Sequence, residues 1–135
     1  MLLSFKDAEN NYDYNTKNIS TISIEKKAVR AEMSLWYASG EDQESVEILE
    51  AEVSKVEELL RSDNDWIVLS TPKAVCGINT SWVVKIRKSK NSIEVKFLND
   101  KGNFKLGKKT EELYNKLKER LDKNKPQYVS SFSEE

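Results

Sequence analysis

The feature that most constrains this chain is a repeated alternation of apolar and polar residues with a period of two. In the segment 29–36, apolar residues occupy every second position: Val29, Ala31, Met33 and Leu35. Successive side chains of a β-strand point to opposite faces, so this pattern predicts a strand with one dry face and one wet face. The segments 82–87 and 93–97 repeat it, and the polar residues 89–92 between them predict a hairpin turn. Ile19, Ile22 and Ile24 predict a further short strand.

Two segments have helical periodicity instead. The apolar residues of the segment 43–62 form one stripe: Val46, Ile48, Leu49, Val53, Val56, Leu59 and Leu60. Some of them follow heptad spacing, but two heptads are too few for a free coiled coil. Packing on the sheet is therefore the expected role of this helix, and a helix–helix dimer contact is the alternative. A second helix is expected from Thr110, with Leu113, Leu117 and Leu121 on its buried line.

The order of these elements predicts the α+β class: a mostly antiparallel sheet of four to six strands with two helices packed on one face. The uncharged run 66–69 predicts a central strand. We expect an irregular N-terminal arm over 1–18, a single domain over 19–126 and a flexible tail over 127–135. The predicted core comprises Met33, Leu35, Val53, Val56, Ile67, Leu69, Val84, Ile86, Val95, Leu117 and Leu121.

The composition of the chain excludes several kinds of catalytic and binding site. The chain has no histidine and one cysteine, Cys76, which excludes histidine-based catalysis and an internal disulfide. Apolar neighbours surround Cys76, so we expect a buried structural thiol. Four glycines leave no Gly-rich phosphate loop, and no apolar run approaches the 20 or so residues of a membrane span. The N-terminus lacks the features of a signal peptide. We expect a cytoplasmic protein with no cofactor, no bound metal and no membrane contact.

Charge is strongly segregated along the chain. Residues 1–80 carry 15 acidic and 8 basic residues, whereas residues 81–125 carry 14 basic and 6 acidic ones. Clustered cations bind phosphates or acidic protein surfaces. The candidate binding residues are Lys85, Arg87, Lys88, Lys90, Lys96 and Lys105, and the basic segment also includes Lys101, Lys108 and Lys109. Trp82 or Phe104 could stack a nucleic-acid base. Alternatively, the acidic helix 43–62 neutralises the basic strands, within the fold or across a dimer.

One pair of residues has the spacing of a catalytic motif. Glu94 and Lys96 lie two apart on a predicted strand, as in the Glu-x-Lys element of PD-(D/E)xK nucleases. The acid could bind Mg²⁺ while the lysine steadies the attacking water. Such a site needs another acid from a neighbouring strand, and the strand 82–88 has none. Asp63 or Asp65 would have to supply it from a loop.

The sequence favours a small non-catalytic binding or regulatory protein, adaptor- or inhibitor-like, that acts through protein–protein contacts. The first alternative is a nucleic-acid-binding protein that uses the basic hairpin region 82–109. The second is a metal-dependent nuclease that uses Glu94 and Lys96. A homodimer is also considered, formed through an exposed remainder of the heptad positions or through an open edge strand at 29–37.

Overall fold

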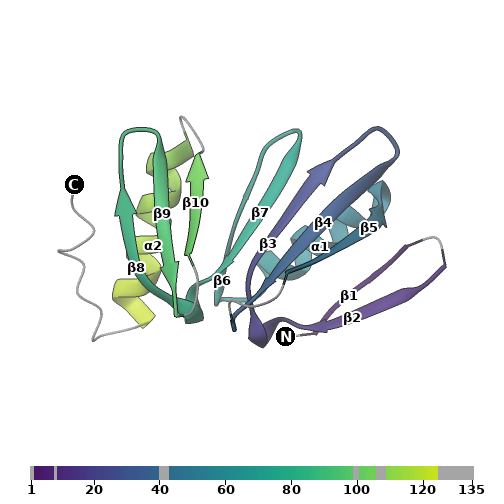
Figure 1. Ribbon diagram of the computed structural model, residues 1–135, viewed down its shortest axis with the longest axis horizontal. Coiled ribbons are helices and arrows are strands. Elements are labelled where there is room, and N and C mark those ends of the chain that lie inside the picture. Colours follow the sequence, from purple (N-terminus) through teal and green to yellow (C-terminus); the bar gives the residue numbers. More distant parts are fainter. Residues whose placement is uncertain (1, 8, 40–42, 99–100, 106–108, 125–135) are drawn as a thin grey trace. The chain divides into compact units, whose positions relative to one another are not determined.

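The computed structural model describes residues 2–7, 9–39, 43–98, 101–105 and 109–124, and the side chains of residues 103, 105 and 122–124 are outside the description. Contacts divide the chain into two compact units, residues 1–79 (the first unit) and residues 80–135 (the second unit). Figure 1 labels their elements. The single domain expected over 19–126 therefore spans the boundary between these units. The expected tail 127–135 lies outside the described residues.

The first unit contains a two-stranded and a five-stranded antiparallel sheet. Its elements are β1 (Leu2–Lys6), β2 (Asn11–Asn15), η1 (Thr16–Asn18), β3 (Ile19–Lys26), β4 (Arg30–Tyr37), β5 (Gln43–Leu49), η2 (Glu50–Glu52), α1 (Val53–Arg61), β6 (Trp66–Ser70) and β7 (Ala74–Asn79). β1 pairs with β2, and the larger sheet has the order β5-β4-β3-β7-β6. The run 66–70, predicted to be a central strand, is an edge strand. β4, considered as an open edge, is an interior strand.

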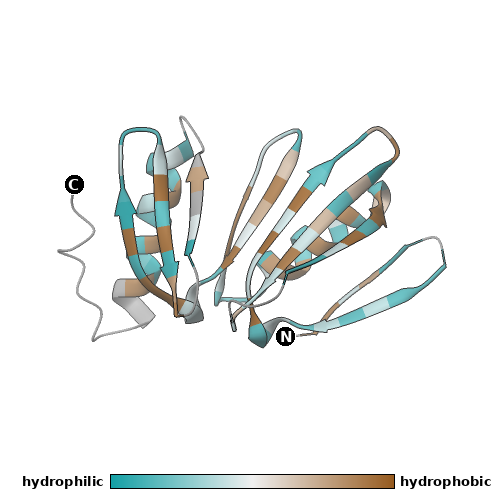
Figure 2. Ribbon diagram, viewed as in Figure 1, coloured by the Kyte–Doolittle hydropathy of each residue, from teal (hydrophilic) through white to brown (hydrophobic). Residues whose placement is uncertain are grey.

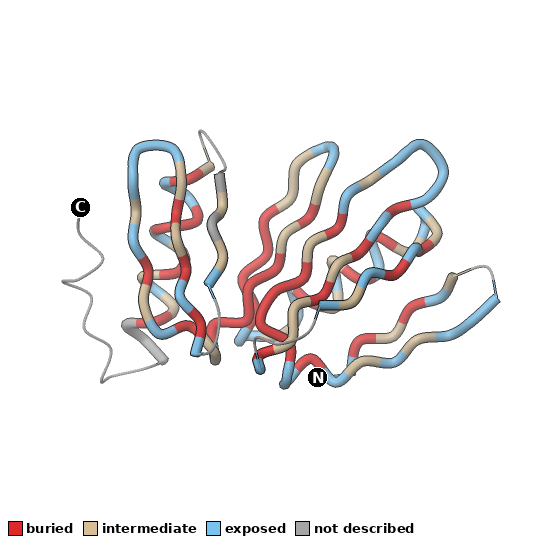
Figure 3. Tube along the Cα trace, in the orientation of Figure 1, coloured by how far each residue is buried: buried red, intermediate tan, exposed pale blue. Residues whose placement is uncertain are grey.

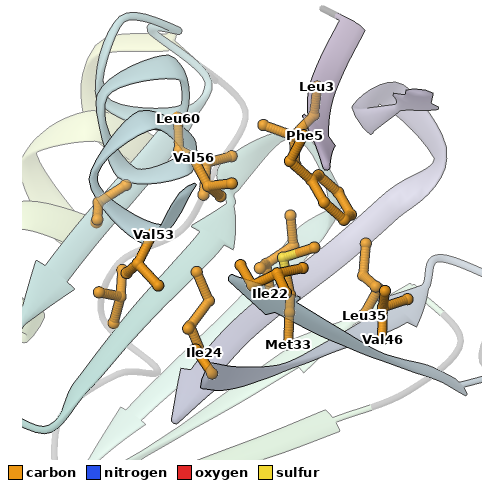
Figure 4. Packing of buried hydrophobic residues seen from close by; sticks show 14 of the residues in the cluster. Leu3, Phe5, Ile22, Ile24, Met33, Leu35, Val46, Val53, Val56 and Leu60 are labelled. Carbon is orange, nitrogen blue, oxygen red and sulfur yellow. The ribbon is translucent and has the colours of Figure 1, made fainter. Parts of the chain in front are cut away.

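One face of the five-stranded sheet carries the core of the first unit. The register pairs Ile22 with Leu35 and Ile24 with Met33, and Val46 lies opposite Met33 on the next strand. All five side chains are buried. Helix α1 covers this face with its buried residues Val53, Val56 and Leu60. Figure 4 shows side chains from the helix, the β1–β2 hairpin and the sheet gathered in this core. Each large apolar side chain buried there contributes about 1.5–3 kcal/mol.

The segment 1–18 was expected to be an irregular arm, and this prediction is wrong. β1 and β2 form a hairpin in which Leu3 lies opposite Tyr14 and Phe5 lies opposite Tyr12. Leu3 and Phe5 are buried and belong to the core of the first unit. Asp7 closes the turn by accepting hydrogen bonds from the backbone N–H groups of residues 9 and 10. The apolar and aromatic residues alternate with a period of two, a signal that the many asparagines obscured.

The helix expected over 43–62 is also corrected. Residues 43–49 form strand β5, residues 50–52 a short 3₁₀ turn, and only Val53–Arg61 is α-helical. Val46 and Ile48 are buried by strand alternation and face the same core as the helix that follows. The heptad spacing therefore crosses two elements and forms no continuous helical face. We also considered that an acidic helix over 43–62 neutralises the basic strands. The chain forms no helix over that whole segment.

The second unit is a three-stranded antiparallel sheet with one helix. Its elements are η3 (Thr80–Trp82), β8 (Val83–Lys88), β9 (Ser92–Phe97), β10 (Lys101–Lys105) and α2 (Thr110–Asn124), and the sheet order is β10-β9-β8. Ile86, Ile93, Val95 and Phe97 are buried on one face. Helix α2 contacts β8 and β9 and buries its own apolar residues Leu113, Tyr114, Leu117 and Leu121. The predicted hairpin 82–97 and the predicted second helix are confirmed.

Alternation of hydropathy and burial is visible along β8 and β9 in Figures 2 and 3. The predicted core is confirmed except at Val84, whose side chain is 44% exposed. The register shifts between Val83 and Lys85, so that Val83 takes the buried position opposite Phe97. A bulge of this kind moves one residue out of the regular alternation. The class is thus α+β with mostly antiparallel strands, but the strands form three sheets and not the single sheet of four to six strands that we expected. The two helices do not share one face as expected, because α1 packs in the first unit and α2 in the second.

Candidate interaction face

The face of the second unit's sheet that points away from its buried apolar residues carries a row of three lysines. Lys85 on β8 lies opposite Lys96 on β9, and Lys96 lies opposite Lys101 on β10. We call these three residues the lysine row. Neighbouring strands are about 4.8 Å apart, so the row spans about 10 Å across the sheet. Lys96 is exposed between the buried Val95 and Phe97, and 67% of the Lys101 side chain is exposed.

The next row along the strands is mixed. Arg87 lies opposite Glu94, and Glu94 lies opposite Asn103. The Glu94 carboxylate accepts the diagonal contact of Lys101, with Nζ and Oε2 3.5 Å apart. Among the described residues, Lys85, Arg87 and Lys96 make no ion pair. The lysine row, Arg87 and Glu94 together form what we call the lysine face, which carries four cations and one acid.

Folding alone does not account for the lysine row. Like charges directly opposite each other on neighbouring strands destabilise a sheet, whereas opposite charges stabilise it by about 0.2–1 kcal/mol per pair. Lys85–Lys96 and Lys96–Lys101 are two such unfavourable pairs in succession. A single glutamate at the central position would have removed both. The face is instead suited to an anionic surface, which would offset the repulsion on binding.

The other predicted binding residues fall elsewhere. Lys88 is the last residue of β8, and its side chain lies on the side of helix α2. There its Nζ is 2.6 Å from Oε1 of Glu111 and 5.0 Å from the centre of the Tyr114 ring. Lys90 is exposed in the turn 89–91 between β8 and β9. Lys105 lies opposite Ser92 in the register, and its side chain is outside the description. Of the predicted binding residues, the sheet therefore brings Lys85, Arg87 and Lys96 together on one face.

One of the two aromatic residues considered for base stacking, Phe104, does not lie on the lysine face. Phe104 is opposite the buried Ile93, and its ring lies 3.1 Å from the position that a Cβ atom would take on Gly102. Phe104 therefore packs on the same side as the core. Trp82 precedes the sheet in the 3₁₀ turn η3 and is half-buried.

The nuclease alternative depends on what surrounds Glu94. Glu94 and Lys96 share one face of β9, as the alternation predicts, but the residues opposite Glu94 are Arg87 and Asn103. Within the part of the chain that the structure describes, no three acidic, cysteine or histidine residues come together in a way that could hold a metal ion. The arrangement gives Glu94 a cationic neighbour where metal-dependent hydrolysis needs a second carboxylate.

Two further groups of titratable side chains lie in the first unit. Tyr14 and Tyr37 donate hydrogen bonds of 2.5 and 2.6 Å to the two carboxylate oxygens of Glu44. These bonds lower the pKa of Glu44 below its ordinary value, and burial together with Glu44 raises that of Tyr14. Cys76 lies on β7, where burial raises the pKa of its thiol to about 12, so it stays protonated at neutral pH. The tyrosine–glutamate cluster joins the hairpin to the sheet, and Cys76 is a half-buried free cysteine.

Comparison of the chain with protein-family models, with curated proteins and with solved structures gave no match. Among the described residues, no helix is both long enough and apolar enough to cross a membrane. The proposal below therefore depends on the charges and the register of the strands alone.

Proposed function

We propose that the protein is a non-catalytic binding protein whose lysine face contacts an acidic surface of a partner protein. The observation that carries the proposal is the lysine row, in which three cations occupy directly opposite positions on three strands. Arg87 extends the positive surface along β8. Rows of like charge cost stability in the free protein and gain favourable interactions only when an anionic surface covers them.

A protein partner is favoured over single-stranded nucleic acid by the side chains around the row. Sequence-tolerant binding of single strands combines cations with aromatic rings on which the bases stack. Phe104 packs towards the core, and the five residues of the lysine face include no aromatic side chain. Glu94 also lies within the face, where it would repel a continuous run of phosphates but could accept a hydrogen bond from a protein partner.

The test is affinity capture from cell extract with the purified chain as bait, at low salt and at about 0.5 M salt, with and without nuclease treatment. Arg87→Glu combined with Lys96→Glu removes the positive surface, and Lys116→Glu on helix α2 is a single charge-reversal control away from the lysine face. We expect a protein that is captured at low salt, released at high salt, insensitive to nuclease and lost only with the double reversal.

Two results would contradict the proposal. Capture that depends on intact nucleic acid would assign the lysine face to phosphates. Equal capture by wild type and by the double reversal would exclude the lysine face as the binding site and direct the search to the acidic first unit.

A further inference from the structure

The first unit carries a row of three acidic residues that corresponds to the lysine row but has the opposite charge. Glu25 on β3 lies opposite Glu32 on β4, and Glu32 lies opposite Glu47 on β5. We call these three residues the glutamate row. All three are exposed, because they alternate with the buried residues of the core face: Ile24, Ala31, Met33, Val46 and Ile48. The row therefore occupies the face of the five-stranded sheet opposite to helix α1.

Nearby cations neutralise the glutamate row only in part. Arg30 Nη1 is 3.1 Å from Oε1 of Glu47, and Lys27 Nζ is 3.9 Å from Oε1 of Glu32. Both pairs are largely exposed, and exposed pairs contribute about 0–1 kcal/mol. The row beside it is uncharged and small, with Ser23 opposite Ser34 and Ser34 opposite Ser45. That row itself has no bulky side chain, and the row beyond it has the half-buried Trp36 opposite Thr21.

The two rows match each other in number and spacing. Each consists of three like charges at directly opposite positions on three antiparallel strands, so each has the same strand separation of about 4.8 Å. Lysine and glutamate side chains from two facing sheets can meet, because stacked sheets lie about 10 Å apart with their strands roughly aligned. Docking would leave the four like-charge pairs in place and offset their repulsion by three favourable contacts between opposite charges.

We infer that the acidic surface that fits the lysine face is the glutamate row of a second copy of this chain. This inference rests on the proposed function and names the partner of the same face. Two copies that exchange these contacts reciprocally form a closed dimer, in which the lysine row of each meets the glutamate row of the other. Since the two surfaces attract each other through their opposite charges, the association weakens as salt is raised.

Sedimentation velocity of the purified chain over a concentration series tests the inference. Lys96→Glu inverts the centre of the lysine row, and Glu32→Lys inverts the centre of the glutamate row. Lys116→Glu and Glu58→Lys on the two helices make the same charge changes away from both rows. We expect wild type and both helix variants to form salt-sensitive dimers. Each row variant alone should dimerise on the order of tenfold or more weakly.

The decisive sample is an equimolar mixture of the Lys96→Glu and Glu32→Lys variants. Each keeps the face that the other has lost, and the two inverted faces are again opposite in charge, so the mixture should recover dimers. A wild-type monomer at all concentrations, or a mixture that stays monomeric, would overturn the inference. The capture experiment separates this failure from that of the proposed function, because a different acidic protein captured through Arg87 and Lys96 would preserve the latter. Circular dichroism spectra that match wild type confirm that each variant is folded.

Discussion

The sheets of the two units share one design on their packed faces and differ in sign on their other faces. In both, buried aliphatic residues at alternate positions meet a helix with an apolar stripe. On the opposite faces, one sheet carries three glutamates in a cross-strand row and the other carries three lysines. Mixed charges on the outer faces would suit either fold equally well. The packed faces therefore account for stability, and we assign the rows to binding.

The two units also differ in net charge. The chain as a whole is nearly neutral, with a formal charge of −1, yet the first unit has 15 acidic and 8 basic residues and the second has 8 acidic and 14 basic. An overall value near zero would ordinarily indicate a surface without strong electrostatic character. Here it results from two surfaces of opposite sign, each with its own field.

The largest expected effect concerns the packed face of the second sheet. Phe97 is 2% exposed and lies opposite Val83, so Phe97→Ala removes a ring from the core and leaves a cavity. The expected cost is about 3–5 kcal/mol in the free energy of unfolding. Val84→Ala on the neighbouring strand, at an exposed bulge position, should cost well under about 1 kcal/mol. Urea titrations of both variants measure the difference. Equal costs would show that the bulge in β8 is wrongly placed.

A second prediction concerns the packed face of the first sheet. Gly77 on β7 faces Trp66 and Leu60, and a Cβ atom added there would lie 3.2 Å from Trp66 Cε3 and 3.3 Å from Leu60 Cδ1. Overpacking of this kind costs about 1–3 kcal/mol. Gly77→Ala should therefore lower the thermal midpoint. A neutral result would mean that the helix α1 side of the first unit is more loosely packed than the core of the second.

A third prediction concerns the attachment of the hairpin to the first sheet. Because Tyr14 and Tyr37 lower the pKa of Glu44 below its ordinary value, ionised Glu44 contributes stability that is fully present above that ordinary value. The contribution is lost as pH falls through the folded-state pKa. Glu44→Gln should cost about 1–2 kcal/mol at pH 7. The difference from wild type, followed by denaturation at several pH values, should shrink on acidification. A difference that is constant from pH 7 to pH 3 would contradict this account.

The smallest expected effect has the opposite sign. Replacing the central residue of either row, by Lys96→Ala or Glu32→Ala, removes two like-charge pairs from the sheet. We expect each variant to be as stable as wild type or more stable, by about 0.2–1 kcal/mol, after allowance for the lower strand propensity of alanine. The gain should diminish at high salt. Destabilisation by more than about 1 kcal/mol in dilute monomeric protein would show that the rows serve the fold.

Local patterns predicted the strands with strict alternation and the helix that starts at Thr110. They failed where two periodicities coexist. Val46 and Ile48 match a strand, and together with Val53 and Val56 they also match a helix, so the pattern predicts one helix over 43–62 where the chain forms a strand, a 3₁₀ turn and a shorter helix. The hairpin 1–15 was missed because composition outweighed the alternation of Leu3 with Phe5.

Only the part of the candidate site that lies within one hairpin, the pair Lys85 and Lys96, could be predicted from the sequence. The turn at 89–92 places Lys85 opposite Lys96 once its length is known, and strand alternation places both on the wet face. Joining Lys101 to this row requires the register of a second turn, and the glutamate row requires two further registers along β3, β4 and β5. A shift of one residue at any turn moves the charge to the other face, so the rows follow from registers that composition does not determine.

Carbodiimide cross-linking of a mixture of unlabelled and ¹⁵N-labelled chains tests the central claim most directly, since it joins only carboxylates and amines in contact. After digestion, mass spectrometry identifies the joined peptides and whether their two halves carry the same isotope. The account predicts isotopically mixed peptides that join Glu25, Glu32 or Glu47 to a residue of the lysine row: Lys85, Lys96 or Lys101. Cross-links between these rows that never mix isotopes, or mixed links that avoid both rows, would contradict it.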